Sequence, residues 1–121
     1  MKENKTIQIG VGNIKESLDR FEAVWEKAAS GKKVQPSERL TFASLPLLTS
    51  TLTPARWALL ETLRREGELT IYDLAKKLNR HYKNVHSDVS RLSGLGLIEK
   101  NNDEKVFVPW DLISAEFRLA A

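Results

Sequence analysis

A connection of three residues between two predicted helices constrains the fold of this chain most strongly. Asn79–His81 separates a short helix, expected over 71–78, from a second helix expected over about 82–93. Thr70, with Asp73 three residues later, is a typical start for the first of these helices. The glycines of SGLG (93–96) suit the left-handed geometry that ends the second. Two helices joined by so short a turn form a helix-turn-helix unit.

A further helix is predicted before this unit and a β-hairpin after it. Thr53 followed by Pro54 is a strong helix start, because the hydroxyl can cap the helix and proline fits its first position. This helix is expected over 54–66, ending at Gly67. After the unit, LIEKNNDEKVFVP (97–109) indicates strand, polar turn and strand. The order predicts a winged helix-turn-helix, in which three helices are followed by a hairpin wing.

The helix over about 82–93 combines a narrow apolar stripe with a polar opposite face. At about 100° per residue, Val85, Val89 and Leu92 fall within roughly 60° of one another and define the buried side. The opposite side carries small or hydrogen-bonding residues, which permit a close approach to base edges. Asparagine can pair with adenine, and lysine with guanine. We therefore expect base contacts from Lys83, Asn84, His86, Ser87 and Ser90.

Positive charge is concentrated in the same part of the chain. Residues 76–91 contain five Lys or Arg and one acid, Asp88, so they carry a formal charge of +4 in a chain whose total is +3. Such a basic segment suggests a polyanion partner, although a solvated helix surface is the alternative. The expected phosphate contacts are Lys76, Lys77, Arg80, His81, Tyr82 and Arg91. At the wing we expect Lys100, Asn101, Asn102 and Lys105, unless its two lysines only solubilise the hairpin.

The segments outside this region predict an arm and a closing strand. TIQIGV (6–11) alternates like a half-buried strand, residues 14–30 have helical periodicity after a cap at Asn13, and 39–44 suggests a second strand. LPLLTSTLTP (45–54) is ambiguous and suggests one helical turn from Pro46 followed by a loop. Residues 112–119 alternate like a strand, although 111–118 could equally form a short helix.

These elements together predict an α+β fold with three parts. Residues 1–52 are expected to form a strand-helix-strand arm, 53–110 the winged helix-turn-helix, and 111–121 a strand that packs on the arm. One winged helix covers a single half-site, so a homodimer is the usual solution for affinity. We expect the arm and the last strand to build the dimer interface, with a monomeric core as the alternative. The expected interface residues are Ile7, Ile9, Phe21, Trp25 and Phe117.

The region from LTPARWALLETL to LSGLGLIEK resembles the winged helix-turn-helix of MarR- and ArsR-like regulators. It is most similar to a group of small prokaryotic DNA-binding proteins described as MarR-like, which share the motifs matched here by HYKNVHSDV and VPWD. The similarity extends upstream through IGVG and RFEAVWEKAASG. It implies a transcription regulator, and some members of the group resemble the antitoxins of toxin–antitoxin pairs. His81 departs from the pattern, because an acid is common at that position.

Catalysis, metal binding and membrane insertion find little support in the sequence. The chain has no cysteine, and His81 and His86, five residues apart, do not share a helix face as metal ligands would. GVGN is too short for a phosphate-binding loop, and no nucleophile–base set follows from spacing. No apolar run is long enough to span a bilayer. We expect a cytoplasmic, non-enzymatic protein without cofactor.

Two interpretations of function follow. The first is a sequence-specific double-stranded DNA-binding repressor, with residues 82–93 in the major groove and the wing over 97–108 on adjacent backbone or minor groove. The second is a protein-binding module, or an antitoxin that binds a toxin through the arm and DNA through residues 54–109. The basic segment favours DNA. The operator, the effector and the sense of regulation stay open.

Overall fold

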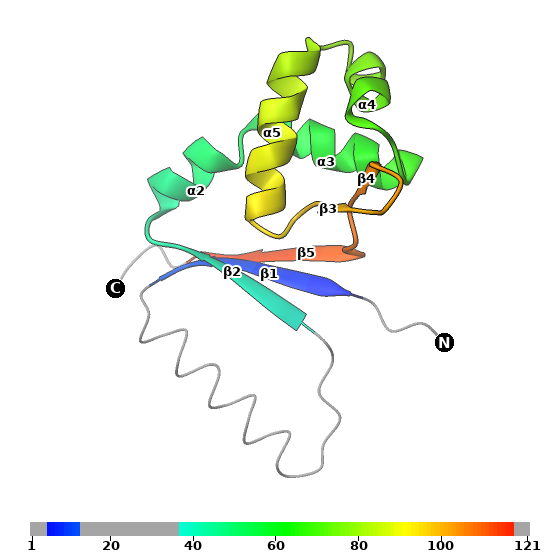
Figure 1. Ribbon diagram of the computed structural model, residues 1–121. Helices are drawn as coiled ribbons and strands as arrows, with labels where there is room; N and C mark the ends of the chain where they lie inside the picture. The colour runs from blue at the N-terminus through cyan, green and yellow to red at the C-terminus, as the bar shows by residue number, and fades with distance from the viewer. Residues whose placement is uncertain (1–4, 13–36, 118–121) are drawn as a thin grey trace, which may run out of the picture. The chain divides into compact units, whose positions relative to one another are not determined.

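The computed structural model describes residues 5–12 and 37–117 (Figure 1). Its elements in chain order are β1 (Thr6–Val11), β2 (Ser37–Phe42), α2 (Leu45–Thr51), α3 (Pro54–Glu66), α4 (Ile71–Leu78), α5 (Tyr82–Gly94), β3 (Glu99–Lys100), β4 (Val106–Phe107) and β5 (Leu112–Glu116). The chain is therefore of the α+β class. It divides into two compact units, residues 1–51 with 110–121, and residues 52–109.

The first unit contains a three-stranded sheet in the order β2-β1-β5. Both neighbours run parallel to the central β1, with Ile9 level with Leu40 of β2 and Ala115 of β5. Next to the sheet, the backbone of Lys5 donates to the Asp111 carboxylate at 2.9 Å and its carbonyl accepts from the Asp111 amide at 2.8 Å. The last strand of the described residues therefore lies beside the first.

The alternation of β1 agrees with the predicted strand over 6–11, and two residues of the expected dimer interface lie on its inner face. Ile7 and Ile9 are each only 2% exposed in the single chain. Side chains this deeply buried within one chain offer little surface to a partner, and their place in a dimer interface stays a prediction. Phe117 differs from them, because 42% of its surface is exposed. Phe21, Trp25 and the predicted helix over 14–30 lie outside the described residues.

The region after β2 differs from the prediction in two ways. The second strand covers Ser37–Phe42 instead of 39–44, and a seven-residue helix, α2, replaces the expected single turn and loop. The hydroxyl of Ser44 accepts a hydrogen bond from the Leu47 amide at 3.2 Å, and its carbonyl accepts from the Leu48 amide at 3.1 Å. Ser44 therefore caps α2, and this cap signal was missed in the sequence. At the other end of the chain, residues 112–116 are a strand, as the alternation indicated.

The second unit contains α3, α4 and α5, and the predicted caps are present. The hydroxyl of Thr53 accepts from the Arg56 amide at 3.3 Å, and that of Thr70 accepts from the Asp73 amide at 3.1 Å. The three-residue connection forms because Asn79, which ends α4, adopts a left-handed conformation with φ of 53°. Asparagine tolerates this region better than most residues. The helices over 54–66, 71–78 and 82–93 are thus confirmed, with α5 one residue longer than expected.

A short antiparallel hairpin follows α5. β3 and β4 are two residues each, with Lys100 level with Val106. Val106 also pairs with Leu69, whose amide donates to the Val106 carbonyl at 3.1 Å, so the segment before α4 extends the hairpin. Gly96, with φ of 83°, provides the left-handed turn after α5. Gly94, in contrast, lies inside the helix. The buried residues of this unit include Leu59, Leu63, Leu74, Val85, Leu92, Leu97, Ile98 and Val106.

Candidate nucleic-acid interface

Helix α5 is held by the three apolar residues that the sequence periodicity identified. Val85 and Leu92 are fully buried and Val89 is 3% exposed. The six polar residues of the opposite side, Lys83, Asn84, His86, Ser87, Ser90 and Arg91, are all exposed. The division of this helix into a buried stripe and a polar outer face is therefore confirmed. All five residues expected to contact bases lie on the outer face.

The N-terminal end of α5 has unpaired hydrogen-bonding capacity. His81 is its N-cap in extended conformation, and no side-chain bond caps the helix there. The amides of Asn84 and Val85 donate to the His81 carbonyl at 3.1 Å each, which leaves the amides before them without a partner inside the helix. Such amides, together with the positive end of the helix dipole, favour an anion.

A groove of about 450 Å³ lies between α4 and this end of α5. Two exposed tyrosines stand at it: Tyr72 stacks under the Lys76 ammonium at 5.1 Å, and the Tyr82 ring lies 5.9 Å from that of His86. The residues that line it are Tyr72, Ala75, Lys76, Asn79, Arg80, His81 and Tyr82. Four of the six residues expected to contact phosphate are among them, and none of the lining residues is acidic. The groove is thus suited to an anionic ligand.

The other two expected phosphate contacts are also exposed. Arg91 lies in the last turn of α5 and Lys77 in that of α4. The Lys77 ammonium is 3.8 Å from a carboxylate oxygen of Glu66, and 54% of its side chain is exposed. A pair this long and this exposed contributes little, so Lys77 can exchange it for another anion.

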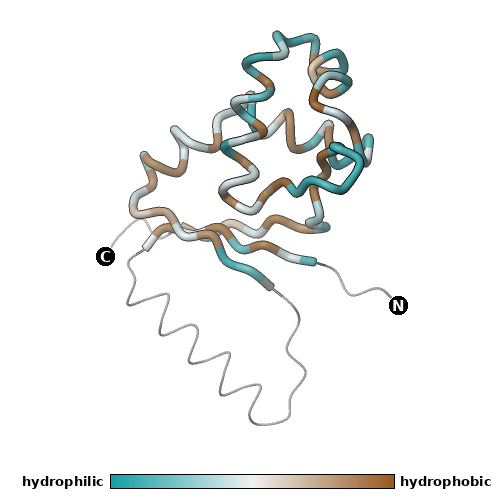
Figure 2. The backbone as a smooth tube through the Cα atoms, viewed as in Figure 1, coloured by the Kyte–Doolittle hydropathy of each residue, from teal (hydrophilic) through white to brown (hydrophobic). Residues whose placement is uncertain are grey.

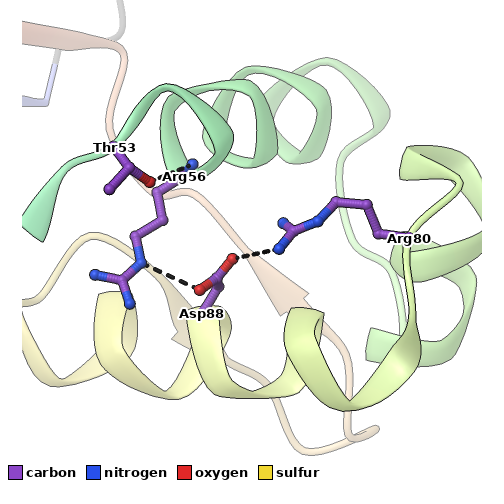
Figure 3. A network of polar contacts seen from close by, with 4 residues as sticks. All are labelled: Thr53, Arg56, Arg80 and Asp88. Carbon is purple, nitrogen blue, oxygen red and sulfur yellow. Dashed lines mark hydrogen bonds and ion pairs between the residues drawn. The ribbon is translucent and has the colours of Figure 1, made fainter.

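An ion network behind the polar face was not predicted (Figure 3). Asp88 of α5 accepts from Arg56 Nε of α3 at 3.1 Å and from Arg80 Nη2 at 2.9 Å. Its side chain is 14% exposed, less than either arginine. Arg80, which we expected to contact phosphate, therefore points to a carboxylate on the inner side of α5. Its Nη1 is buried without a hydrogen-bond partner.

Asn101, one of the residues expected to contact DNA from the wing, stabilises the turn at the hairpin tip. The side-chain oxygen of Asn101 accepts from the amides of Asp103 at 2.9 Å and Lys105 at 3.1 Å, which shapes the turn. Lys100 forms an ion pair with Glu104. Asn102 and Lys105 are exposed and the turn leaves their side chains available, whereas the exposed side chain of Lys100 has Glu104 as a partner. Figure 2 shows hydrophilic residues at this tip and at the α4–α5 connection.

The described residues contain no group of three or more His, Cys, Asp or Glu that could hold a metal ion. Within the same residues, no helix has the length and apolar character needed to cross a bilayer.

Comparison with known proteins gives a family and one structural similarity. No curated protein matches the sequence. The fold is similar to the multiple antibiotic-resistance repressor (MarR) from Listeria monocytogenes 4b F2365, with a TM-score of 0.46 and 22% sequence identity over 79% of this chain. The matched part corresponds to 62% of that repressor. The model of the HVO_A0114 family matches residues 51–115, which is more than half of the sequence. The chain therefore belongs to the HVO_A0114 family.

Proposed function

We propose that the chain is a sequence-specific double-stranded DNA-binding protein that acts as a transcription repressor. The observation that carries this proposal is the outer face of α5, where six exposed polar residues project from a helix fixed by three buried apolar ones. A major groove admits one α-helix, and side chains of this kind form its specific base contacts. Lys83, Asn84, His86, Ser87 and Ser90 contact bases in this proposal.

The phosphate contacts surround this helix. Lys76, His81 and Tyr82 line the groove at the N-terminal end of α5, where the first helix amides also favour an anion. Lys77 and Arg91 add two exposed cations near the last turns of α4 and α5. A phosphodiester backbone segment fits a groove that is basic and has aromatic walls but no acid. Asn102 and Lys105 of the hairpin tip contact adjacent backbone or minor groove.

The proposed repressor binds as a homodimer through the unit that contains the parallel sheet. β5 is an edge strand of that sheet, and Leu112 and Phe117 expose 54% and 42% of their surface. Large apolar residues exposed along a sheet edge are typical of an interaction site. Light scattering of the purified chain is expected to give twice the 13.7 kDa mass, and Phe117→Asp is expected to lower it. A single 13.7 kDa species at micromolar concentration would contradict the dimer.

DNA selection from a random pool, followed by salt titration of the selected duplex, tests the proposed function. A preferred sequence is expected to emerge, and the logarithm of its association constant is expected to fall linearly with the logarithm of salt concentration. Each neutralised phosphate contributes a slope of about −0.9. Absence of DNA binding at low salt would overturn the proposal and favour a protein-binding module.

A further inference from the structure

We infer that Asp88 is a positioning residue for DNA recognition, which fixes the N-terminal half of α5 against α3 through Arg56 and Arg80. The inference rests on the proposed function and deepens it. Asp88 does not itself contact DNA in this account. It determines where the residues that contact bases are held.

The side chain of Asp88 links three segments, namely α5, α3 and the turn before α5. Its two carboxylate oxygens are used separately, one by Arg56 Nε from α3 and the other by Arg80 Nη2 from the turn before α5 (Figure 3). The distances of 3.1 Å and 2.9 Å are those of charge-assisted hydrogen bonds, which are stronger and more directional than neutral ones. The Asp88 carboxylate therefore restrains α5 both from the preceding helix and from its own entry turn.

The restrained end of α5 is the end that carries the base-contacting residues. Arg80 directly precedes the N-cap His81, and Lys83 and Asn84 follow within the first turn. His81 forms no side-chain cap at this end of α5. The Arg80–Asp88 ion pair restrains the first turn in place of such a cap. A small change in the direction of the first turn displaces Lys83, Asn84 and Ser87 together. Base contacts depend on such geometry, whereas phosphate contacts depend mainly on charge.

The charges argue against a direct DNA contact by Asp88. Its carboxylate is the only acid among residues 76–91, and it would repel phosphate if it lay on the outer face. It lies instead on the inner side, 14% exposed, between two guanidinium groups. If Asp88 acted only through its charge, neutralising it would strengthen binding to all DNA. If it positions α5, neutralising it weakens binding to the preferred sequence selectively.

Both arginines lose a charged partner when Asp88 is neutralised. Arg80 is affected most, because its Nη1 is already buried without a partner and Nη2 would lose its carboxylate. A partly buried cation without a counter-charge moves toward water or another anion. We expect Arg80 to leave its position and the first turn of α5 to move with it.

The test compares Asp88→Asn, Arg56→Gln and the double variant with the full unmodified chain. Arg65→Gln, on the exposed side of the same helix α3, is the matched control. Affinity for the selected duplex and for a scrambled duplex is measured at several salt concentrations. Urea unfolding at the temperature of the binding assay verifies that every variant is folded there. Amide hydrogen exchange is followed at Asn84 and Val85, whose amides bond to His81.

For Asp88→Asn and Arg56→Gln we expect the affinity for the selected duplex to fall by about tenfold or more, which is the effect of losing a charge-assisted hydrogen bond. Scrambled duplex is expected to bind within about threefold of the unmodified chain, with an unchanged salt slope. The double variant is expected to lose little more affinity than Asp88→Asn alone, because that substitution already removes the ion pair with Arg56. Exchange at Asn84 and Val85 is expected to accelerate in all three, and Arg65→Gln to leave every readout unchanged.

The outcomes separate this inference from the proposed function. If the unmodified chain prefers one sequence and Asp88→Asn keeps that preference with unaltered exchange at α5, the positioning role is wrong while the function stands. Stronger binding of Asp88→Asn to both duplexes would likewise contradict the positioning role, and would show that Asp88 acts on DNA binding only through its charge. If the unmodified chain binds no DNA at low salt, the proposed function fails, and the recognition role of Asp88 fails with it.

Discussion

Replacement of Asn84 and of Lys77 by alanine is expected to affect DNA binding in two different ways. Asn84 is exposed on the first turn of α5, and an asparagine that pairs with a base contributes about 1–3 kcal/mol of discrimination. Asn84→Ala should therefore lower the preference for the native base at one position of each half-site by roughly 5- to 150-fold. The affinity for other sequences should change little.

Lys77→Ala should instead weaken binding to all sequences alike. Its side chain is 54% exposed and its nitrogen lies 3.8 Å from the Glu66 carboxylate, so little free energy is lost when Lys77 exchanges this pair for a phosphate. Removal of one phosphate contact lowers the salt slope by about 0.9 per protomer. Arg65→Ala, which removes the same charge from the exposed last turn of α3, is the matched control and should leave the slope unchanged.

Fluorescence anisotropy with a labelled duplex measures both effects. The selected duplex and its single-base variants are titrated with each protein variant at four or more salt concentrations. The reasoning is refuted if Asn84→Ala and Lys77→Ala lose affinity equally across all sequences. It is also refuted if Arg65→Ala lowers the salt slope as much as Lys77→Ala.

Three further predictions concern the stability of the second unit, measured by urea unfolding. Leu63→Ala, at a fully buried position of α3, should cost about 2–5 kcal/mol, and a loss below about 1 kcal/mol would show that this site is not core. Thr70→Ala removes the acceptor of the Asp73 amide and should cost about 1 kcal/mol, whereas Thr70→Ser should be close to neutral. Asn79→Ala should destabilise by about 1 kcal/mol because φ is 53°, while Asn79→Gly should be tolerated; equal effects of the two would contradict the left-handed conformation.

The sequence predicted those features that depend on neighbouring residues. Thr53 and Thr70 cap their helices as expected because a cap bonds to an amide three residues later. The buried stripe of α5 likewise follows from the helical period. In each case the interacting groups lie within a few turns of one another, so a short stretch of sequence contains the whole signal.

The features that sequence reasoning missed depend on contacts between distant residues. Arg56 and Asp88 are 32 positions apart, and nothing near Arg56 marks it as a partner. The position of Asp88 as the single acid in a basic segment was the available signal. Ile7 and Ile9 show a related limit, because alternation identifies a buried face but not whether the same chain or a partner buries it.

The central claim is that the outer face of α5 contacts DNA. The most direct test is to titrate the protein with the selected duplex and to follow the chemical shifts of its backbone amides. The account predicts that the largest changes occur at Lys83, Asn84, His86, Ser87 and Ser90, with smaller ones at Asn102 and Lys105 of the hairpin tip. The strands β1, β2 and β5 should change little apart from effects of dimerisation already present without DNA. Changes centred on the sheet, with α5 unaffected, would contradict the account.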